Sequence, residues 1–290
     1  MKSYIDLNGC GSICFTRLIK ALNEYSSDIE IVEDKIKADL IVINVNGRRD
    51  KVLRITKEIL ASGNSYAIIQ HCLRSTKNKN TSDWLDIWKN AKVVWSAYNL
   101  NHKLKEDGND IDFNFYHAPF GVDGRIFYPL NMERKYLACT TGLSYLSESV
   151  REVIIAARHV GGRVAHLGTA DIKKDGVDCF SNLTDKEVNE LYNQCHFVSG
   201  LRRVEGFEFP AAEGLLTGAT PILYDAEHYK DWYSGVGEFI PEIGRNQIIK
   251  DLIELFKKKR KKVPDEYILE GQKRFNWETI ITNFWRLCNG

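Results

Sequence analysis

Short apolar runs alternate with helical stretches through the first half of the chain. The apolar runs predict strands over residues 4–7, 29–32, 40–45, 66–70, 93–96 and 113–117. Apolar residues at helical spacing predict helices over 13–25 and 50–61, and another that begins at Ser82. Residues 40–45 are almost all apolar, as strands covered on both faces are. Strands that alternate with helices of roughly 10–15 residues are typical of βαβ units, so we predict a parallel sheet.

The alternation breaks at about 119–130 and then starts again. The break, PFGVDGRIFYPL, contains glycines and prolines typical of a linker. Beyond it the pattern predicts strands over 136–139, 164–167, 197–199 and 220–223, and helices over 147–160, 184–194, 246–259 and 279–287. We therefore predict an α/β protein with two Rossmann-like, doubly wound domains, 1–129 and 130–290, which face each other across a cleft. The last helix is expected to pack in a core, either that of the second domain or, by returning, that of the first.

The segment from Ser199 to Asp225 has the most informative pattern of the chain. It reads as a strand end, a loop, a helix that begins at Pro210, a glycine turn and a second strand. Proline suits the first helical position, but Phe209 before it is a poor N-cap. Backbone N–H groups from Gly206 to Phe209 are therefore expected to lack a side-chain partner, and such a helix start is an anion-binding site.

Two carboxylates flank this predicted anion site. Glu205 lies in the loop, and Glu213 lies one turn into the helix. Ionised carboxylates accept hydrogen bonds strongly, so the pair suits a ligand that carries hydroxyls as well as phosphate. Nucleotide-sugars combine both features. The alternative interpretation is an ordinary strand–loop–helix–strand unit with solvated glutamates.

Composition narrows the class of protein without choosing among enzymes. The 290 residues are 43% hydrophobic and 27% charged, with a net charge of +1, which is typical of a soluble globular protein without overall attraction to nucleic acid or membrane. The 7 cysteines form no Cys-x-x-Cys pair, so we expect reduced thiols and a cytoplasmic setting. No signal-peptide core and no apolar run of about 20 residues is visible.

Several motifs of the second half occur together in one known family. DCFSNLTDKEVNELYNQCHFV and EGFEFPAAEGLLTGATPIL follow each other between Val177 and Asp225, and PFGVDGRIFYPL stands at the domain junction. These motifs resemble the retaining, nucleotide-sugar-dependent glycosyltransferases of the GT-B fold with a Glu-x7-Glu signature. The resemblance covers about a third of the chain, whereas the first half fits only at the level of the fold.

The resemblance implies a role for each residue of the signature. Glu213 would hold the ribose hydroxyls of the donor and Glu205 would contact the sugar ring. The N–H groups of Gly206 and Phe207 would lie against the sugar and the phosphates. The donor would be a UDP- or GDP-sugar bound by the second domain, while the first domain would bind the acceptor. Such enzymes need neither a metal nor another cofactor.

The chain departs from the family pattern where the diphosphate should bind. The family usually places Arg and Lys after the first strand of the second domain, but this strand ends in Thr141-Gly142 and no basic residue follows before Arg151. A leaving diphosphate needs positive charge or aimed donors. Arg202 and Arg203 are the nearest substitutes. The alternative is that they are surface arginines, paired with Glu205 or with Glu208.

Glu208 is a second departure, because the family commonly has glycine there. Its side chain either narrows the choice of donor or faces water.

In the first domain, His71 ends a predicted strand at the edge where ligands bind. Because histidine titrates near neutral pH, His71 is a candidate to organise the acceptor hydroxyl, and a hydrogen-bonded core histidine is the alternative. Gly11, in a glycine turn before the first helix, would shape the loop that faces the donor phosphates.

The basic run from Lys257 to Lys262 follows a predicted amphipathic helix. One interpretation is that these cations stabilise the helix, because they lie at the negative end of its dipole. The alternative is that the run makes a weak contact with an anionic membrane surface.

We therefore predict a retaining, metal-independent hexosyltransferase whose acceptor is a glycan or a lipid-linked sugar. One alternative is the same chemistry on a hydroxylated base in DNA, against which the near-neutral charge counts. The others are a catalytically inactive sugar-nucleotide-binding protein and a dinucleotide oxidoreductase, which rests only on the glycine turn around Gly11.

Overall fold

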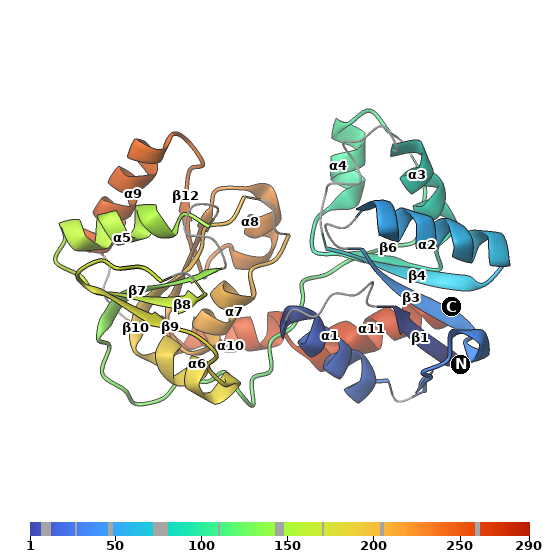
Figure 1. The fold of residues 1–290 in the computed structure, drawn as a ribbon, viewed down its shortest axis with the longest axis horizontal. Coiled ribbons are helices and arrows are strands. Elements are labelled where there is room, and N and C mark those ends of the chain that lie inside the picture. Colours follow the sequence, from blue (N-terminus) through green and yellow to red (C-terminus); the bar gives the residue numbers. More distant parts are fainter. Residues whose placement is uncertain are drawn as a thin grey trace. The chain divides into compact units, whose positions relative to one another are not determined.

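A computed structural model of the chain describes residues 1–6, 13–26, 28–45, 49–71, 81–109, 111–142, 148–169, 171–203, 206–258 and 262–290. It divides into two compact units (Figure 1). The first unit comprises Met1–Gly121, Val204–Phe207 and Trp277–Gly290, and the second comprises Val122–Arg203 and Glu208–Asn276. The chain therefore passes between the units near 121–122 and again near 276–277, and a short loop at 204–207 is grouped with the first unit.

The first unit is built on a parallel sheet of six strands. The strand order is β2-β1-β3-β4-β5-β6, and all neighbours run parallel. The strands are β1 (Lys2–Asp6), β2 (Glu30–Ile31), β3 (Leu40–Val45), β4 (Ser65–Gln70), β5 (Val94–Ser96) and β6 (Phe115–His117). Every residue of β3 is buried, which is the arrangement that its continuous apolar run predicts.

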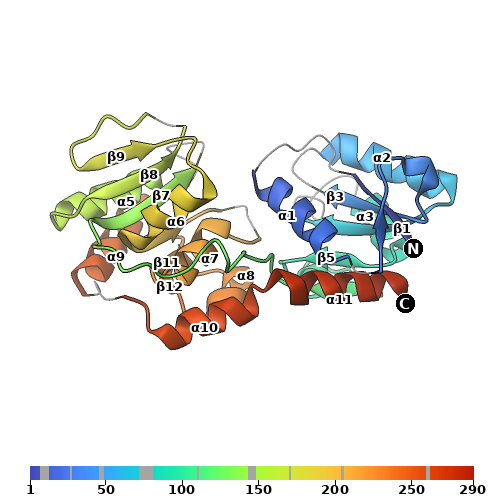
Figure 2. The ribbon, with the colours of Figure 1, turned by 90° about the horizontal axis from the view of Figure 1, so that it is seen from below.

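Helices cover both faces of this sheet. They are α1 (Ile13–Glu24), α2 (Arg49–Ser62), α3 (Thr81–Asn90), α4 (Leu100–Glu106) and α11 (Trp277–Asn289), with a 3₁₀ turn, η1 (Lys35–Lys37). Figure 2 shows α11 on the same side of the sheet as α1. Trp285 Nε1 donates a hydrogen bond to the Leu22 carbonyl at 3.3 Å, and the rings of Phe284 and Trp95 lie 5.3 Å apart. The last helix therefore completes the core of the first unit.

The second unit repeats the architecture with a second parallel sheet of six strands. The order is β12-β11-β10-β7-β8-β9. The strands are β7 (Tyr136–Gly142), β8 (Val164–Gly168), β9 (Val177–Phe180), β10 (Cys195–Gly200), β11 (Thr220–Tyr224) and β12 (Glu238–Ile240). β7 and β10 are neighbours in the middle of the sheet, although about 50 residues separate them in sequence. Their carboxyl ends therefore meet at one edge.

The helices of the second unit are α5 (Val150–His159), α6 (Asp185–Asn193), α7 (Phe209–Leu216), α8 (Glu227–Tyr233), α9 (Arg245–Lys258) and α10 (Asp265–Arg274). α5 and α9 pack together on one face of the sheet, whereas α6 and α10 lie on the other (Figure 1). Thr184 caps α6 through a capping box with Glu187: Thr184 Oγ1 accepts from the Glu187 N–H at 3.3 Å, and the Glu187 carboxylate accepts from the Thr184 N–H at 2.7 Å.

The predicted α/β class and the alternation of parallel strands with helices are confirmed. One boundary in the key segment differs by a residue. α7 begins at Phe209 with Glu208 as its N-cap, because the Glu208 carbonyl accepts the first intrahelical bond from the Ala212 N–H at 3.1 Å. Pro210 is therefore the second helical residue. Within the described ranges, no helix has the length and apolar character that a bilayer crossing requires.

Candidate functional site

Several predicted donor-binding residues meet at the carboxyl edge of the second sheet. Thr141 and Gly142 end β7, and β10 ends at Gly200, two residues before Arg202. The two strands are in register, with Thr140 opposite Ser199. In a parallel α/β sheet this edge is where ligands bind, so the topology brings together residues about 60 positions apart in sequence.

Contacts with Thr141 and Glu208 hold Arg202 at this edge. Its Nη2 donates to Thr141 Oγ1 at 3.2 Å, and its Nε lies 3.5 Å from a carboxylate oxygen of Glu208. The Arg202 side chain is 24% exposed, whereas that of Glu208 is fully buried. The interpretation that Glu208 faces water is therefore wrong. A buried carboxylate requires a cation or donors, and Arg202 supplies a positive charge next to it.

Arg203 makes different contacts from its neighbour. Its Nε lies 2.9 Å from Glu242 Oε1, and its guanidinium stands over the Tyr224 ring at 5.2 Å. Its side chain is 38% exposed. Consecutive arginines therefore turn to different partners: Arg202 bonds to Thr141 at the end of β7, whereas Arg203 contacts Glu242 and Tyr224.

Glu213, the acidic residue of the signature that lies in the described part of the chain, is in α7 and is 3% exposed. The N-cap residue of α7, Glu208, makes no side-chain capping bond within the described part of the chain, and anion binding at this helix start stays a prediction. The first-turn N–H groups are thus not satisfied by their own cap.

Two tyrosines of α8 also reach this region, and sequence reasoning missed both. The Tyr229 hydroxyl donates to the Arg202 carbonyl at 2.9 Å, and the Tyr233 hydroxyl donates to the Glu208 carbonyl at 2.8 Å. Both tyrosines are fully buried. Burial raises the pKa of Tyr233 well above its usual value, with the charge of Glu208 adding to the effect, so its hydroxyl keeps its proton. Their four-residue spacing, which puts both on one helix face, is the signal that could have found them.

In the first unit, His71 follows β4 and is enclosed by aromatic rings. Its ring meets the edge of Phe15 at 4.7 Å and stacks on Phe120 at 4.8 Å. Its Nε2 lies 3.2 Å from Asn44 Oδ1. Because Asn44 Nδ2 donates to the Asp6 carbonyl at 3.1 Å, the amide oxygen faces His71 and Nε2 carries the proton.

Desolvation by burial lowers the pKa of His71 to about 3. The imidazole is therefore neutral at pH 7, and the expectation that it titrates in the useful range is wrong. Its second nitrogen, Nδ1, is then unprotonated and can accept a hydrogen bond. His71 can therefore accept a hydrogen bond through Nδ1, but it does not act as a charged acid at pH 7.

Gly206 and Phe207 are the described residues of the loop grouped with the first unit. A Cβ atom on Gly206 would collide with the Tyr98 ring, and the Phe207 ring meets that of Phe120 edge-on at 5.9 Å. Gly142 has a φ of 147°, and a Cβ there would collide with the Glu148 carboxylate. Both glycines thus stand where a side chain does not fit.

Some predicted residues lie outside the described part of the chain. These are Glu205, Gly11 and the middle of the basic run, 259–261. At the ends of that run, Lys257 lies 2.9 Å from Glu254, and Lys262 lies 2.9 Å from Asp265.

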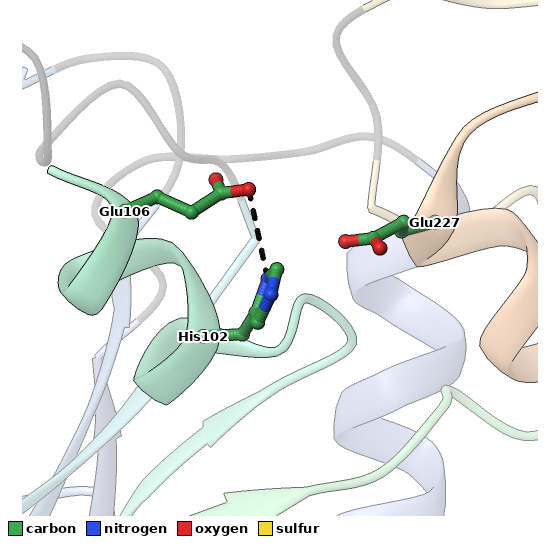
Figure 3. Close-up of side chains that lie close together, drawn as sticks. All are labelled: His102, Glu106 and Glu227. Atoms are coloured by element: carbon green, nitrogen blue, oxygen red, sulfur yellow. Dashed lines mark ion pairs between the residues drawn. The ribbon is translucent and has the colours of Figure 1, made fainter.

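A further titratable pair lies on α4 of the first unit. His102 Nδ1 and Glu106 Oε1 are 3.8 Å apart, one helical turn from each other (Figure 3). Glu227, also drawn there, begins α8 of the second unit. All three side chains are exposed. Exposed groups of this kind are common on protein surfaces, and we assign no ligand to them.

No family model matches the chain, and no curated protein matches its sequence. Its fold is nevertheless similar to those of solved glycosyltransferase structures. Sucrose-phosphate synthase from Thermosynechococcus elongatus has a TM-score of 0.77 at 13% identity, over 99% of this chain and 98% of that one. Two structures of HepE from Anabaena each match over 99% of both chains. The UDP complex has a TM-score of 0.76 at 10% identity, and the UDP-glucose complex has 0.74 at 12%. The predicted GT-B fold is thereby confirmed.

Proposed function

We propose that this chain is a retaining glycosyltransferase that moves a hexose from a nucleoside diphosphate sugar to an acceptor hydroxyl. The observation that carries the proposal is the Arg202–Thr141 contact at the carboxyl edge of the second sheet. It puts a partly buried guanidinium beside a strand-end hydroxyl and an uncapped helix start, which together suit a diphosphate. The similarity of the fold to the UDP and UDP-glucose complexes of HepE supports a nucleotide-sugar donor, UDP-glucose first and GDP-sugars second.

Each residue then has a chemical task. Arg202 neutralises the charge that develops on the leaving diphosphate, replacing the Arg and Lys that the related pattern has after the first strand. The strand end at Thr141 and Gly142 lines the diphosphate. Glu213 accepts hydrogen bonds from the ribose, and Glu205 contacts the sugar ring. Backbone N–H groups of Gly206 and Phe207 lie along the sugar and phosphates.

His71 acts in this proposal as a neutral hydrogen-bond acceptor. Its Nε2–H is engaged by Asn44, so Nδ1 is the atom that accepts from a sugar or acceptor hydroxyl. A pKa near 3 makes it a weak base, so it orients a hydroxyl and does not remove its proton at an early stage. The first unit would then bind the acceptor, a glycan or a lipid-linked sugar, and the reaction would proceed without a metal ion.

Donor binding is the direct test of this function. UDP-, GDP- and ADP-sugars are compared by thermal shift and calorimetry, since a ligand present at 100 times its dissociation constant stabilises a protein by about 2.7 kcal/mol. Glu213→Ala is expected to weaken donor binding by about tenfold or more, the loss of hydrogen bonds to a charged group. Glu205→Ala is expected to lower kcat more than affinity, because its contact strengthens in the transition state.

The two arginines provide a matched pair for the diphosphate role. Arg202→Ala should weaken UDP binding and lower turnover, whereas Arg203→Ala, whose side chain binds Glu242, should change both by less than about threefold. If Arg202→Ala leaves UDP affinity and turnover at the wild-type level, the role assigned to Arg202 is wrong. Tight donor binding with neither transfer nor slow release of free sugar would instead support an inactive sugar-nucleotide-binding protein. Transfer to hydroxylated DNA bases, tested in the same assay, would identify the other alternative.

A further inference from the structure

Two buried tyrosines hold the two ends of one loop. Tyr229 donates to the carbonyl of Arg202, and Tyr233, one helical turn later on α8, donates to the carbonyl of Glu208. The O···O distances are 2.9 and 2.8 Å, and both side chains are fully buried. One helix face thus fixes two backbone positions that are six residues apart.

The loop ends are also tied to each other. Arg202 and Glu208 form the ion pair at 3.5 Å, and the Arg202 N–H donates to the Gly200 carbonyl at 2.8 Å. A Cβ on Gly200 would lie only 3.1 Å from Glu208 Cβ and Cγ, so the end of β10 and the start of α7 are in close contact. Arg202 and the start of α7 are the groups that the proposed function places against the donor diphosphate.

α8 is itself held in place by the rest of the second unit. A guanidinium nitrogen of Arg274, at the end of α10, bonds to the carbonyls of Trp232 and Ser234, which end α8. The Phe275 ring packs on Tyr233 with centroids 5.5 Å apart. A helix of only seven residues is marginal by itself, so these contacts explain how α8 can position another segment.

We propose that Tyr229 and Tyr233 are positioning residues that hold Arg202 and the start of α7 in the geometry that binds the donor diphosphate. This inference rests on the proposed function, because it takes Arg202 and the start of α7 to bind the donor diphosphate. Donor binding and catalysis favour groups that are already oriented, since little reorganisation is then needed when the ligand arrives. A tyrosine hydroxyl suits the task because it bonds to a backbone carbonyl from a rigid ring with two rotatable bonds. The pKa of Tyr233, raised by burial, keeps that donor protonated at every working pH.

Tyr229→Phe and Tyr233→Phe test this proposal, because each removes one hydroxyl and keeps the ring. Tyr66→Phe is the matched control. Tyr66 lies in the first unit, is 2% exposed, and its hydroxyl donates to the Ile87 carbonyl at 2.6 Å. All three variants lose the same kind of buried bond, so each should lower the thermal midpoint by a few degrees, about 2–4 °C.

The readout that separates positioning from stability is the affinity for UDP and for UDP-glucose, measured well below the midpoint of every variant. We expect Tyr229→Phe and Tyr233→Phe each to weaken UDP binding about 2- to 10-fold and to lower kcat/KM for transfer, while Tyr66→Phe stays at the wild-type level. Affinities within twofold of wild type in both loop variants would overturn the proposal. A wild-type protein that binds no nucleotide or nucleotide-sugar would instead refute the proposed function, on which the inference rests.

If a variant does not fold, hydrogen exchange of the wild-type protein tests whether the backbone at Arg202 is held in place. The Arg202 amide, bonded to the Gly200 carbonyl, should exchange as slowly as amides of α8 if the loop end is held. Exchange of this amide at the rate of an exposed loop would contradict the positioning role.

Discussion

The two sheets are both parallel and six-stranded but differ in strand order, and their carboxyl edges carry different chemistry. In the first unit, the described side chains beside the end of β4 are aromatic: His71 lies between Phe15 and Phe120. The corresponding edge of the second unit is charged, with Arg202 beside the buried Glu208. Two parallel sheets of one chain therefore carry different groups at the ends of their strands.

Burial has a different effect on the ionisable groups of the two edges. In the first unit no charged group contacts the imidazole within the described part of the chain, so burial lowers its pKa to about 3 and the group stays neutral. In the second unit a carboxylate is enclosed together with a guanidinium, so a charge can be retained. The presence of a counter-charge therefore decides whether a buried group keeps its own charge. Substitutions that remove the aromatic rings around His71 or the cation beside Glu208 test this difference.

The largest effect is expected from Phe120→Ala, which opens the aromatic edge. Phe120 is 3% exposed and contacts the rings of His71, Trp95 and Phe207. Removing such a side chain should cost about 3–5 kcal/mol of the free energy of unfolding of the first unit. Water would then reach His71, and its pKa should rise from about 3 towards the ordinary 6.5.

Denaturant titration and NMR titration of His71 measure the two consequences of this substitution. Phe120→Leu is the control, since it fills much of the space, and its effect on both quantities should be smaller. An unchanged His71 pKa in a folded Phe120→Ala protein would show that the aromatic enclosure is not what keeps the imidazole neutral.

Arg202→Ala should have the next largest effect on stability, because it removes the ion pair between Arg202 and Glu208. It leaves Glu208 buried without this cation, which should lower the free energy of unfolding by about 2–3 kcal/mol, less than for a fully buried pair because Arg202 is 24% exposed. Arg203→Ala breaks a pair whose side chains are 38% and 46% exposed and should cost at most about 1 kcal/mol.

A double variant separates the buried charge from lost packing. Arg202→Ala with Glu208→Gln removes both charges, so much of the stability lost in Arg202→Ala should return. Equal stability losses in Arg202→Ala and Arg203→Ala, measured by thermal or urea unfolding, would contradict the difference between the two arginines.

The smallest predicted effect is a dependence of stability on pH in the first unit. The folded pKa of His71 is about 3, below the value of about 6.5 in the unfolded chain. Between these values the unfolded state binds a proton that the folded state does not. Stability is therefore greatest above pH 6.5 and falls as the pH falls towards 3, by at most about 1.4 kcal/mol per pH unit.

His71→Gln isolates this contribution, because glutamine can still donate a hydrogen bond but does not titrate. The free energies of unfolding of the variant and of wild type are compared at pH 7.5 and pH 5. Wild type should lose more stability than the variant over this range. Parallel losses would show that His71 titrates normally in the folded protein.

Sequence patterns predict the parts of the fold that depend on local hydrophobicity. The strand over residues 40–45 matches β3 at both ends, because every one of its residues is buried. By contrast, α4, α8, α10 and β12 were not predicted. α8 has only three aromatic residues among charged ones, and α10 is mostly polar, so their apolar periodicity is weak. They are stabilised by contacts with other segments instead.

In the candidate site, too, some features follow from local sequence and others depend on packing between distant segments. That Thr141 and Arg202 lie at strand ends follows from predicted strands and from the rule for parallel sheets. That Arg202 bonds to Thr141, that Glu208 is buried, and that Tyr229 reaches the Arg202 carbonyl depend on packing between segments 20 to 60 residues apart. Propensity and spacing carry no information about such pairings.

The return of α11 to the first unit constrains the order in which the protein can be made. Trp277, Phe284 and Trp285 are buried, and the Tyr116 hydroxyl bonds to the Ile280 carbonyl at 3.0 Å. The ribosome must therefore synthesise the whole second unit before the first can close its core. During that interval the nascent first unit exposes the apolar surface that α11 later covers, and exposed apolar surface of this kind favours aggregation.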